Sequence, residues 1–392
     1  MPQTSTVFMT GLTGYLGCHL AYDLLDHGYH VIALVREGKN GSAQERAENA
    51  IKLVDPDVVP SLENLTAVAG TVQGIDDALI AEINGASATG RIDQVWHCAA
   101  TFKFHEDERP EIRAINIDGV RNVLNLVEKV NGDNPAPRYF HVSTAYSCGR
   151  EYGNVPEAFT PDSATFRTLY EWSKHEGEAQ VVAAQEASNL DATIFRPAII
   201  VGSPNTRVFN DSAYYQVCSA FYRVRKHYAD KQGADFDGHI AVRMMADPDT
   251  RLNFVPVDYV VDAMRRLSLV THNETEDLKV FNIVNEDAPT LGFVHKHLCA
   301  SLGVTGFEVT RETEFGDQPL TRFERALARN IAFQTPYMSD DMGFDTTRYR
   351  THVSEETLPN PVIDGPFLAA INKRFFEALE ARQGTKKAAS RG

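Results

Sequence analysis

The sequence predicts an α/β protein in which a doubly wound parallel sheet carries a smaller, mostly C-terminal cap. Short apolar runs alternate with helical patterns through residues 1–202, as expected for repeated β-α-β units. A glycine-rich turn follows the first of these runs, and the alternation breaks after residue 202. We therefore divide the chain into a sheet domain, a cap and a disordered tail. The sheet domain is 1–202, and the chain returns to it near 253–285. The cap is 203–252 and 286–382, and the tail is 383–392.

The strands are predicted from short runs of β-branched and other apolar residues, which are typical of strands covered on both faces. They lie at 7–9, 31–35, 65–69, 94–99, 139–143, 192–195 and 280–284. Apolar residues at helical spacing predict helices between these strands and in the cap. These helices lie at 16–25, 115–130, 170–188, 291–302 and 367–382.

The charge balance limits the classes of partner. The chain has 392 residues, with 53 acidic and 38 basic side chains and a formal net charge of −15 at pH 7. An acidic surface repels phosphate backbones and anionic lipid headgroups, so we expect no nucleic-acid partner and no anionic membrane surface. A cofactor that carries phosphate would need a local cationic spot to bind here.

The cysteine pattern favours neither a disulfide framework nor a zinc site. The five cysteines are far apart, and no C-x-x-C pair occurs. The N-terminus lacks the pattern of a signal peptide, and no apolar run approaches the roughly 18 residues that span a bilayer. We therefore expect a soluble, cytoplasmic protein without a transmembrane segment or a metal site.

The first predicted strand runs directly into the turn TGLTGYLG at residues 10–17, which opens a helix. Its glycines follow G-x-x-G-x-x-G spacing. Glycine permits a tight turn and lets the backbone approach a pyrophosphate, whose charge then lies at the helix N-terminus. The position between a strand and an amphipathic helix favours a Rossmann-type dinucleotide site over a glycine turn that binds nothing.

The end of the second strand distinguishes between the two nicotinamide cofactors. Arg36 stands where a 2′-phosphate would lie, and its guanidinium suits phosphate. Lys39 could assist. Glu37 is a counter-argument, because an acid there can bind a ribose 2′-hydroxyl instead. Arg36 could also be a solvated loop residue, but we favour NADPH.

The segment YEWSK places Tyr170 and Lys174 four residues apart, on one face of a predicted helix. A free phenol titrates near pH 10, and a neighbouring ammonium would bring its pKa toward neutrality. The lysine could also hold the hydroxyls of a nicotinamide ribose. The spacing alone fits an ordinary surface helix equally well.

A second candidate group lies upstream, where His141-Val142-Ser143-Thr144-Ala145 ends a strand. The carboxyl ends of parallel strands line the ligand crevice of such sheets. A hydroxyl at this position could therefore donate a hydrogen bond to a substrate carbonyl, with Ser143 and Thr144 as the candidates.

Taken together, the motifs resemble those of the extended short-chain dehydrogenases/reductases, in the expected order over roughly residues 5–285. Within that group the chain looks most similar to the fatty acyl-CoA reductases and to the thioester reductase domains of carboxylic acid reductases and peptide synthetases. The motifs that carry the resemblance are TGLTGYLG, VWHCAATFKF, INIDGVRNVL, HVSTAYSCG, YEWSK, FRPAIIVG and NFVPVDYVVDA.

The resemblance implies a role for each matching residue. Thr144, Tyr170 and Lys174 would form the catalytic triad, with Asn116 supporting the lysine through water. The other implied positions all contact the cofactor, with Tyr170 and Lys174 contributing as well. The pyrophosphate cradle would be Gly11, Thr13, Gly14, Tyr15, Leu16 and Gly17, the adenosine would pass Ala99 and Ala100, and the nicotinamide carboxamide would meet backbone around Pro197, Ile199 and Ile200.

One position departs from the family pattern. The family usually has Asp after the glycine that ends the third strand, where it contacts adenine. This chain has Gly70-Thr71-Val72, so a hydroxyl replaces the acid.

The resemblance implies NADPH-dependent reduction of an acyl thioester to an aldehyde, with a second turnover giving the alcohol. The chain has no room for adenylation or carrier domains, so we expect the thioester on CoA or a separate carrier protein. The alternative keeps the cofactor and changes the substrate to a ketone, an aldehyde, a sterol-like alcohol or a nucleotide sugar. A non-catalytic cofactor sensor is disfavoured, because a sensor needs no tuned acid.

Two other groups of residues have ordinary structural interpretations. The aromatic and basic residues of 214–228 could bind an acyl chain and the phosphates of a carrier, or could be packing with solvated charges. His97, Cys98 and His141 lie in apolar strands, where core residues are more frequent than ligands or nucleophiles.

Overall fold

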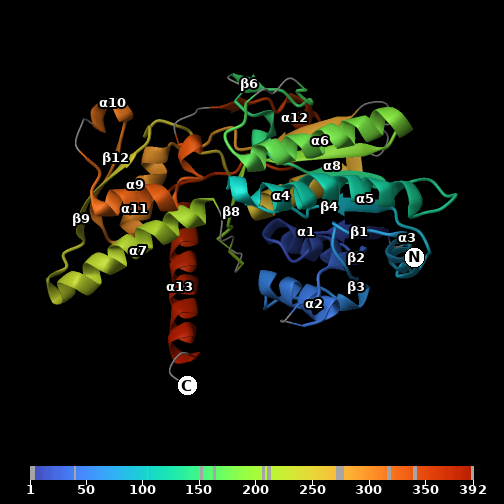
Figure 1. Cartoon of the computed structure of the whole chain (residues 1–392), viewed down its shortest axis with the longest axis horizontal. Coiled ribbons are helices and arrows are strands. Elements are labelled where there is room, and N and C mark those ends of the chain that lie inside the picture. The colour runs from blue at the N-terminus through green and yellow to red at the C-terminus, as the bar shows by residue number, and fades with distance from the viewer. Residues whose placement is uncertain are drawn as a thin grey trace. The chain divides into compact units, whose positions relative to one another are not determined.

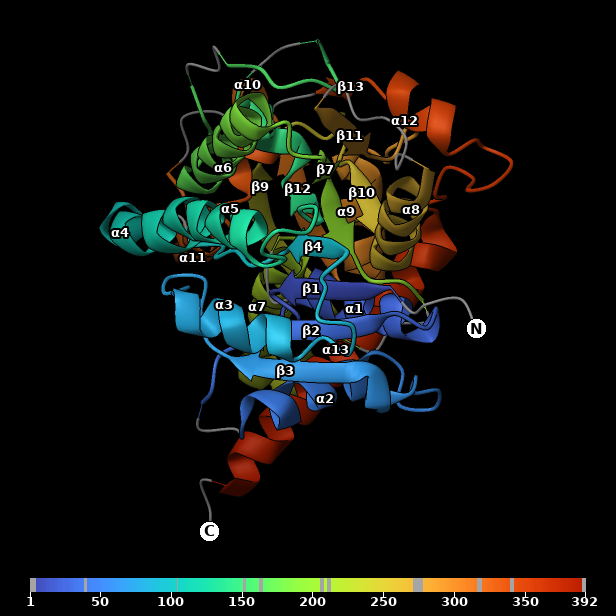
Figure 2. The ribbon, with the colours of Figure 1, turned by 90° about the vertical axis from the view of Figure 1, so that its right-hand side faces the viewer.

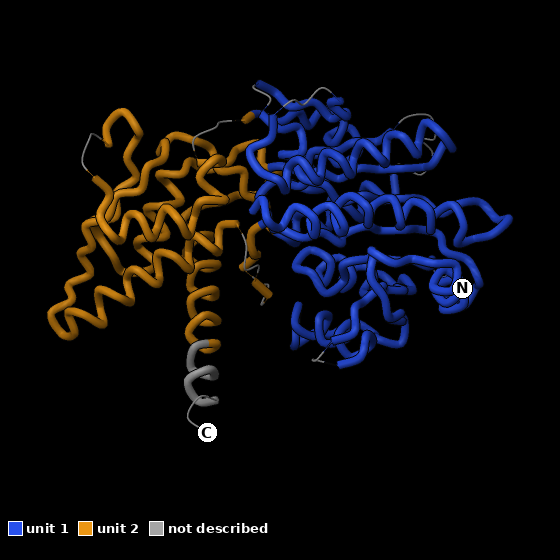
Figure 3. Tube along the Cα trace, in the orientation of Figure 1, with its two compact units in different colours: residues 1–200, 257–284, 343–359 blue, residues 201–256, 285–342, 360–392 orange. Residues whose placement is uncertain are grey.

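The chain is described by a computed structural model (Figure 1). It describes residues 5–38, 41–103, 105–150, 153–161, 165–204, 208–209, 213–270, 278–315, 319–338 and 342–389, with side chains through 382. The chain forms two compact units (Figure 3). Unit 1 is Met1–Ile200, Val257–Val284 and Gly343–Pro359, and unit 2 is Val201–Pro256, Asn285–Met342 and Asn360–Gly392.

Unit 1 is built on a seven-stranded sheet with the order β3-β2-β1-β4-β5-β7-β11. Every neighbouring pair is parallel, which confirms the predicted doubly wound α/β fold. Figure 2 shows β3, β2, β1 and β4 side by side. The strands are β1 Thr6–Thr10, β2 His30–Val35, β3 Leu65–Ala69, β4 Gln94–His97, β5 Arg138–Val142, β7 Ala192–Pro197 and β11 Lys279–Ile283.

Helices cover both faces of this sheet. On one face α1 contacts α2 and α8, and on the other α5 contacts α6 and shares an apolar cluster with α3. The chain adds β2 and β3 on one side of β1 and then returns to add β4 on the other side. In such folds a ligand crevice opens where the strand order reverses, here between β1 and β4. The helices are α1 Tyr15–Asp26, α2 Ala43–Val54, α3 Asp77–Gly85, α4 Arg109–Ile112, α5 Asp118–Lys129, α6 Leu169–Ser188, α8 Val257–Val270 and α12 Thr347–His352.

Burial on both faces explains why the strands read as continuous apolar runs. Val95 and Tyr139 join the cluster under α3, α5 and α6. Trp96 and Phe140, the next residues along, point to the opposite face, where their rings stack with centroids 4.3 Å apart. Both faces are therefore core.

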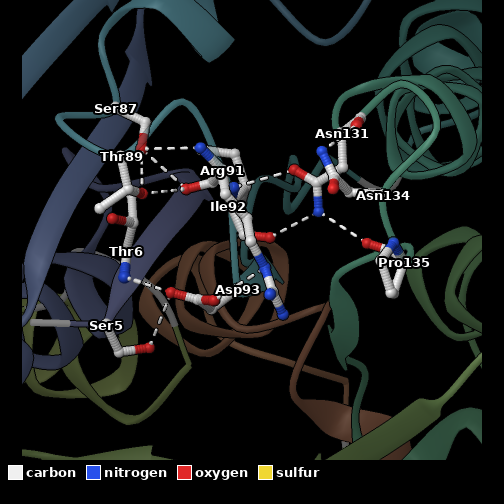
Figure 4. A network of polar contacts seen from close by, with 10 residues as sticks. All are labelled: Ser5, Thr6, Ser87, Thr89, Arg91, Ile92, Asp93, Asn131, Asn134 and Pro135. Atoms are coloured by element: carbon white, nitrogen blue, oxygen red, sulfur yellow. Dashed lines mark hydrogen bonds and ion pairs between the residues drawn. The ribbon is translucent and has the colours of Figure 1, made fainter. Parts of the chain in front are cut away.

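A polar network closes the amino end of β4, opposite the predicted crevice (Figure 4). Asn131 follows α5 and is 5% exposed. Its Oδ1 accepts from the Ile92 N–H at 2.9 Å, and its Nδ2 donates to the carbonyls of Ile92 and Pro135, each at 2.8 Å. Beside it, Asp93 accepts from the Thr6 N–H at 2.8 Å and ties β1 to β4. This network satisfies buried backbone groups that β-ladders leave unpaired.

Residues 343–359, which the sequence places with the cap, belong to unit 1. The short strand β13 Gly343–Phe344 pairs with β6 Asn154–Val155. Glu157 then accepts hydrogen bonds from the N–H groups of Asn282 at 3.0 Å and Tyr349 at 2.9 Å. A two-residue ladder and the Glu157 carboxylate make these attachments, so neither strand has the apolar pattern that would reveal it.

Unit 2 contains a parallel strand pair and a set of helices. The pair is β9 His239–Met245 with β12 Thr305–Thr310. The remaining elements are the helices of unit 2, the strand β10, and the strand β8, which lies where the first segment of unit 1 ends. Their bounds are β8 Ile199–Val201, α7 Tyr214–Gln232, β10 Phe254–Pro256, α9 Leu291–Leu302, α10 Glu312–Phe315, α11 Arg322–Asn330 and α13 Gly365–Ala389.

The aromatic and basic segment 214–228 is used for packing inside unit 2. Tyr214 is buried, and its hydroxyl donates to Asn372 Oδ1 at 2.7 Å. Arg223 donates to Asn330 at 3.0 Å, and Arg225 donates to the Leu302 carbonyl at 2.7 Å. These contacts favour packing over an acyl or phosphate site.

Helix α13 extends through Ala389. For residues 383–392, predicted to be a disordered tail, the structure describes the backbone through residue 389 and none of the side chains. Among the described helices, none combines the length and apolar character that crossing a bilayer requires.

Candidate active site

The glycine turn after β1 packs directly on the end of β4. Gly11 has φ +81°, and a Cβ there would lie 2.6 Å from the Ala99 nitrogen. A Cβ on Gly17 would lie 2.1 Å from the Gly11 carbonyl oxygen. Only glycine fits at these two positions, because any side chain would collide with backbone. The turn can therefore be this tight only with the observed glycines.

The turn leaves the N-terminus of α1 open to a ligand. Gly14 caps this helix without a side-chain hydrogen bond, and both Thr13 and Gly14 are exposed. Free N–H groups and the helix dipole attract an anion at such a position. Tyr15 and Leu16 are half-buried in the first turn. These residues fit the pyrophosphate of a dinucleotide.

Two arginines lie at the end of β2, Arg36 in the loop after the strand and Arg46 on α2, although the sequence indicated only the first. Arg36 is exposed, and its carbonyl oxygen accepts a hydrogen bond from the half-buried guanidinium of Arg46 on α2. A Cβ on Gly38 would lie 3.5 Å from Arg46 Nη1, so Arg46 also lies against the loop after β2. Lys39 lies outside the described residues. Arg46 falls ten residues after Arg36, where sequence spacing gives no signal.

Helix α6 brings Tyr170 and Lys174 to the carboxyl end of β5. Thr168 caps the helix, and its hydroxyl accepts from the Glu171 N–H at 3.2 Å. Lys174 is 3% exposed, and its Nζ donates to the Val142 carbonyl at 2.6 Å. Burial lowers the pKa of Lys174 to about 8, against the opposing effect of Glu178. The ammonium is therefore poised to change charge near neutral pH.

The phenol of Tyr170 differs from the sequence expectation. We expected the Lys174 ammonium to lower its pKa, whereas burial, with the charge of Glu171, raises the pKa of Tyr170. The Lys174 ammonium instead donates its hydrogen bond to the Val142 carbonyl. Sequence spacing places the two side chains on one helical face but does not fix which acceptor the lysine selects.

Asn116 lies in a π-helical turn, Arg113–Ile117, directly before α5. Its Nδ2 donates to Ser173 Oγ at 2.9 Å, and Ser173 Oγ donates to the Tyr170 carbonyl at 2.8 Å. Single π turns inside helices frequently mark functional sites. Here the turn lets Asn116 reach α6 between the two candidate catalytic residues.

Thr144 follows β5, two residues after the carbonyl that holds Lys174. It is 6% exposed, and its Oγ1 accepts from the Tyr146 N–H at 3.4 Å. Other cofactor candidates follow neighbouring strands of the same sheet: Ala99 and Ala100 come after β4 and are half-buried, and Pro197 ends β7. Ile199 and Ile200, also half-buried, follow directly in β8.

A buried ion pair lies one helical turn beyond Lys174. Glu178 and Arg196 are both fully buried, with 2.6 Å between Oε2 and Nη2. Ser147 Oγ also donates to Glu178 Oε1 at 2.7 Å. Burial opposes the charge on Glu178, but Arg196 and these hydrogen bonds leave its pKa below the ordinary value. A charged Glu178 in turn raises the pKa of Lys174.

Two histidines lie beneath this helix, on the strands β4 and β5. The rings of His97 and His141 stack with centroids 5.6 Å apart. Burial and then Lys174 lower the pKa of His97 to about 3 and shift the pKa of His141 in the same direction. Both rings are therefore neutral core residues, in line with the structural interpretation of the sequence.

Comparison with known proteins identifies the family. A model of an NAD-binding family, described as male sterility protein, matches residues 9–264. The chain belongs to this family. The predicted resemblance is confirmed, as is the class of enzyme, an NAD(P)-dependent oxidoreductase related to acyl-CoA reductases.

Relatives in this family include two curated reductases. The chain is 26% identical over 233 residues to fatty acyl-CoA reductase 1 of Homo sapiens, covering 51% of this chain and 44% of that protein. It is 24% identical over 359 residues to the carboxylic acid reductase of Mycobacterium tuberculosis (strain ATCC 25618 / H37Rv), covering 83% of this chain and 28% of that protein. The chain thus spans less than half the length of each.

A solved structure shows the same fold over nearly the whole chain. The terminal R domain from the myxalamid PKS-NRPS biosynthetic pathway superposes with a TM-score of 0.73 at 18% identity. The match covers 98% of this chain and 92% of that domain. At this level of identity the likeness establishes the fold.

Proposed function

We propose that this chain uses NADPH to reduce an acyl thioester to an aldehyde. The observation that carries the proposal is the attachment of α6 to β5 through the Lys174–Val142 hydrogen bond. This hydrogen bond holds Tyr170 and Lys174 near the carboxyl end of β5, which Thr144 follows. The glycine turn follows the carboxyl end of β1 in the same sheet. The names of the relatives, an acyl-CoA reductase and a carboxylic acid reductase, support the same substrate class.

The residues present fit a nicotinamide dinucleotide. Gly11 and Gly17 form a cradle that any Cβ would fill, and the open N-terminus of α1 suits the pyrophosphate. Arg36, with Arg46 behind it, supplies the cationic group that a 2′-phosphate needs on an acidic protein. When bound, NADPH would supply the hydride that adds to the carbonyl carbon of the thioester.

The side chains of this chain manage the charge and the proton. The hydroxyls of Thr144 and Tyr170 donate hydrogen bonds to the oxygen as negative charge develops on it. Tyr170 then transfers its proton to that oxygen, which gives a hemithioacetal. The C–S bond breaks as the hydroxyl proton passes through solvent to the sulfur, which releases an aldehyde and a thiol. The phenolate that remains is disfavoured by burial; in this proposal the positive charge of Lys174 opposes that cost until the phenolate takes a proton from solvent.

The substrate arrives as a thioester on CoA or on a separate carrier protein in this proposal. A second turnover would carry the aldehyde to the alcohol by the same residues. We place the reaction in the cytoplasm, where thiols stay reduced, because all five cysteines are thiols in the structure.

The decisive experiment is an NADPH-oxidation assay with identification of the products. Acyl-CoAs, carrier-bound acyl groups and free aldehydes are supplied in parallel, and release of thiol is measured in each reaction. For at least one thioester we expect one NADPH oxidised per thiol released where the product is the aldehyde, and two where the aldehyde is carried on to the alcohol. Oxidation with aldehydes or ketones alone would instead support the carbonyl-reductase alternative.

A further inference from the structure

An exposed aromatic ring lies directly on the candidate catalytic phenol. Phe102, in the loop after β4, stacks on Tyr170 with ring centroids 4.9 Å apart and an interplanar angle of 28°. Its side chain is nevertheless 51% exposed. One face of the ring thus contacts the phenol while the rest remains open to a ligand.

The position of Phe102 is fixed on both sides along the chain. The preceding residue, Thr101, donates its N–H to Asn116 Oδ1 at 2.7 Å, and its carbonyl accepts from Asn116 Nδ2 at 3.0 Å. The following residue, Lys103, forms ion pairs with Glu111 at 2.6 Å and Glu108 at 3.6 Å. These contacts restrict the backbone on either side of Phe102, and so restrict where its ring can lie.

Asn116 also links the two stacked rings through the backbone. Its Nδ2 contacts Ser173 Oγ, which donates to the carbonyl of Tyr170. One amide side chain therefore sets both the loop that carries Phe102 and the helical turn that carries Tyr170. The stacking is a consequence of this shared anchor, so the ring has a defined place relative to the phenol.

We propose that Phe102 is the wall of the acyl site, where the first carbons of an apolar acyl chain pack beside the reacting carbonyl. This inference rests on the proposed thioester reduction. The charged side chain that follows Phe102 in the sequence, Lys103, is paired with Glu108 and Glu111, so an alkyl group can approach the ring at low desolvation cost. A chain on Phe102 also keeps water from the phenol beneath it.

The wall makes binding depend on chain length in a predictable way. A two-carbon group is too short to cover the ring, whereas a long alkyl chain buries its open face and gains apolar contact. Phe102 is then a specificity-determining residue: its removal weakens long chains selectively and leaves the cofactor site intact.

The test uses thioethers of pantetheine, the arm that CoA and carrier proteins share, because a thioether binds without turnover. Binding of S-dodecylpantetheine and S-ethylpantetheine is measured by calorimetry in the presence of NADP⁺. We expect Phe102→Ala to weaken the dodecyl compound about tenfold and the ethyl compound less than about twofold. Phe102→Leu should restore most of the dodecyl affinity, because leucine retains apolar area.

Leu53→Ala is the matched control, since Leu53 is an apolar side chain of α2 that is 60% exposed. It should leave both affinities unchanged. Equal dodecyl binding by Phe102→Ala and the wild type, or no dodecyl binding by the wild type, would overturn the acyl wall. Binding that depends on Phe102 in a protein that reduces no thioester would instead overturn the proposed reaction and leave the apolar site standing.

Discussion

Lys174 donates a 2.6 Å hydrogen bond from Nζ to the main-chain carbonyl of Val142, which joins α6 to the end of β5. The lysine is thereby held away from bulk water, and this burial lowers its pKa to about 8. The ordinary value for lysine is 10.5. A group that would be charged at all physiological pH values on the surface therefore titrates within the working range of an enzyme.

Activity should fall as pH rises through about 8, because Lys174 loses its proton there. We expect kcat/KM for a thioester to decline about tenfold per pH unit on the alkaline side. Lys174→Arg, whose charge persists to high pH, should be less active but should lack this decline. The measurement is a pH profile of kcat/KM for both proteins, and an alkaline decline shared by the arginine variant would contradict the assignment.

The stability effect of Lys174 has the opposite direction. Its folded pKa of about 8 lies below the ordinary 10.5, so the unfolded chain binds more protons between these values. The free energy of unfolding therefore gains from this group as pH rises through the window. Loss of activity above pH 8 would then not arise from a loss of stability at Lys174.

Tyr170→Phe should abolish turnover while NADPH still binds. The variant loses the proton donor but keeps the ring that stacks on Phe102. We expect kcat to fall by about 10²–10⁴ and the Kd of NADPH to change by less than about twofold. Tyr22→Phe on α1 is a matched control that removes a hydroxyl bonded to the Val58 carbonyl. Wild-type turnover in Tyr170→Phe would remove this residue from the mechanism.

The sheet and its glycine turn could be predicted because both leave a dense local signal. Strands such as 31–35 are buried on both faces and read as apolar runs, and Gly17 is fixed by its contact with Gly11 within the turn. The acceptor chosen by Lys174 and the ring placed on Tyr170 could not be predicted. Each depends on a partner from a distant segment, which spacing along the chain does not encode.

Gly17→Ala tests the cofactor cradle. The new methyl group would lie 2.1 Å from the Gly11 carbonyl oxygen, so the turn must shift and its N–H groups lose their alignment. We expect the Kd of NADPH to rise at least about tenfold, measured by fluorescence titration. Gly85→Ala, at the end of α3 with no atom within 4 Å of the new Cβ, should bind NADPH normally. Unchanged affinity in Gly17→Ala would argue against this turn as the pyrophosphate site.

Asn131→Ala should lower stability without affecting the site. The substitution leaves the N–H and carbonyl of Ile92 without their side-chain partner at the amino end of β4 (Figure 4). We expect the free energy of unfolding to fall by about 1–3 kcal/mol in urea titrations, with NADPH affinity retained. Asn134→Ala removes one 3.2 Å hydrogen bond from an exposed side chain and should cost much less. Equal losses in the two variants would show that the network adds little.

Arg36 and Arg46 should separate NADPH from NADH. Arg36→Ala removes the exposed guanidinium at the end of β2, and we expect the Kd of NADPH to rise about 10- to 100-fold, because hydrogen bonds to charged groups are worth about 1.5–3 kcal/mol. The Kd of NADH should change by less than about twofold, since its ribose carries no phosphate. Arg46→Ala should give a smaller loss in the same direction, because Arg46 acts partly by holding the Arg36 carbonyl. Arg91→Ala, an exposed arginine at the amino end of β4 that is paired with Asp93, provides the control for lost surface charge. Parallel losses for both cofactors in Arg36→Ala would mean that this arginine shapes the loop and does not select the 2′-phosphate.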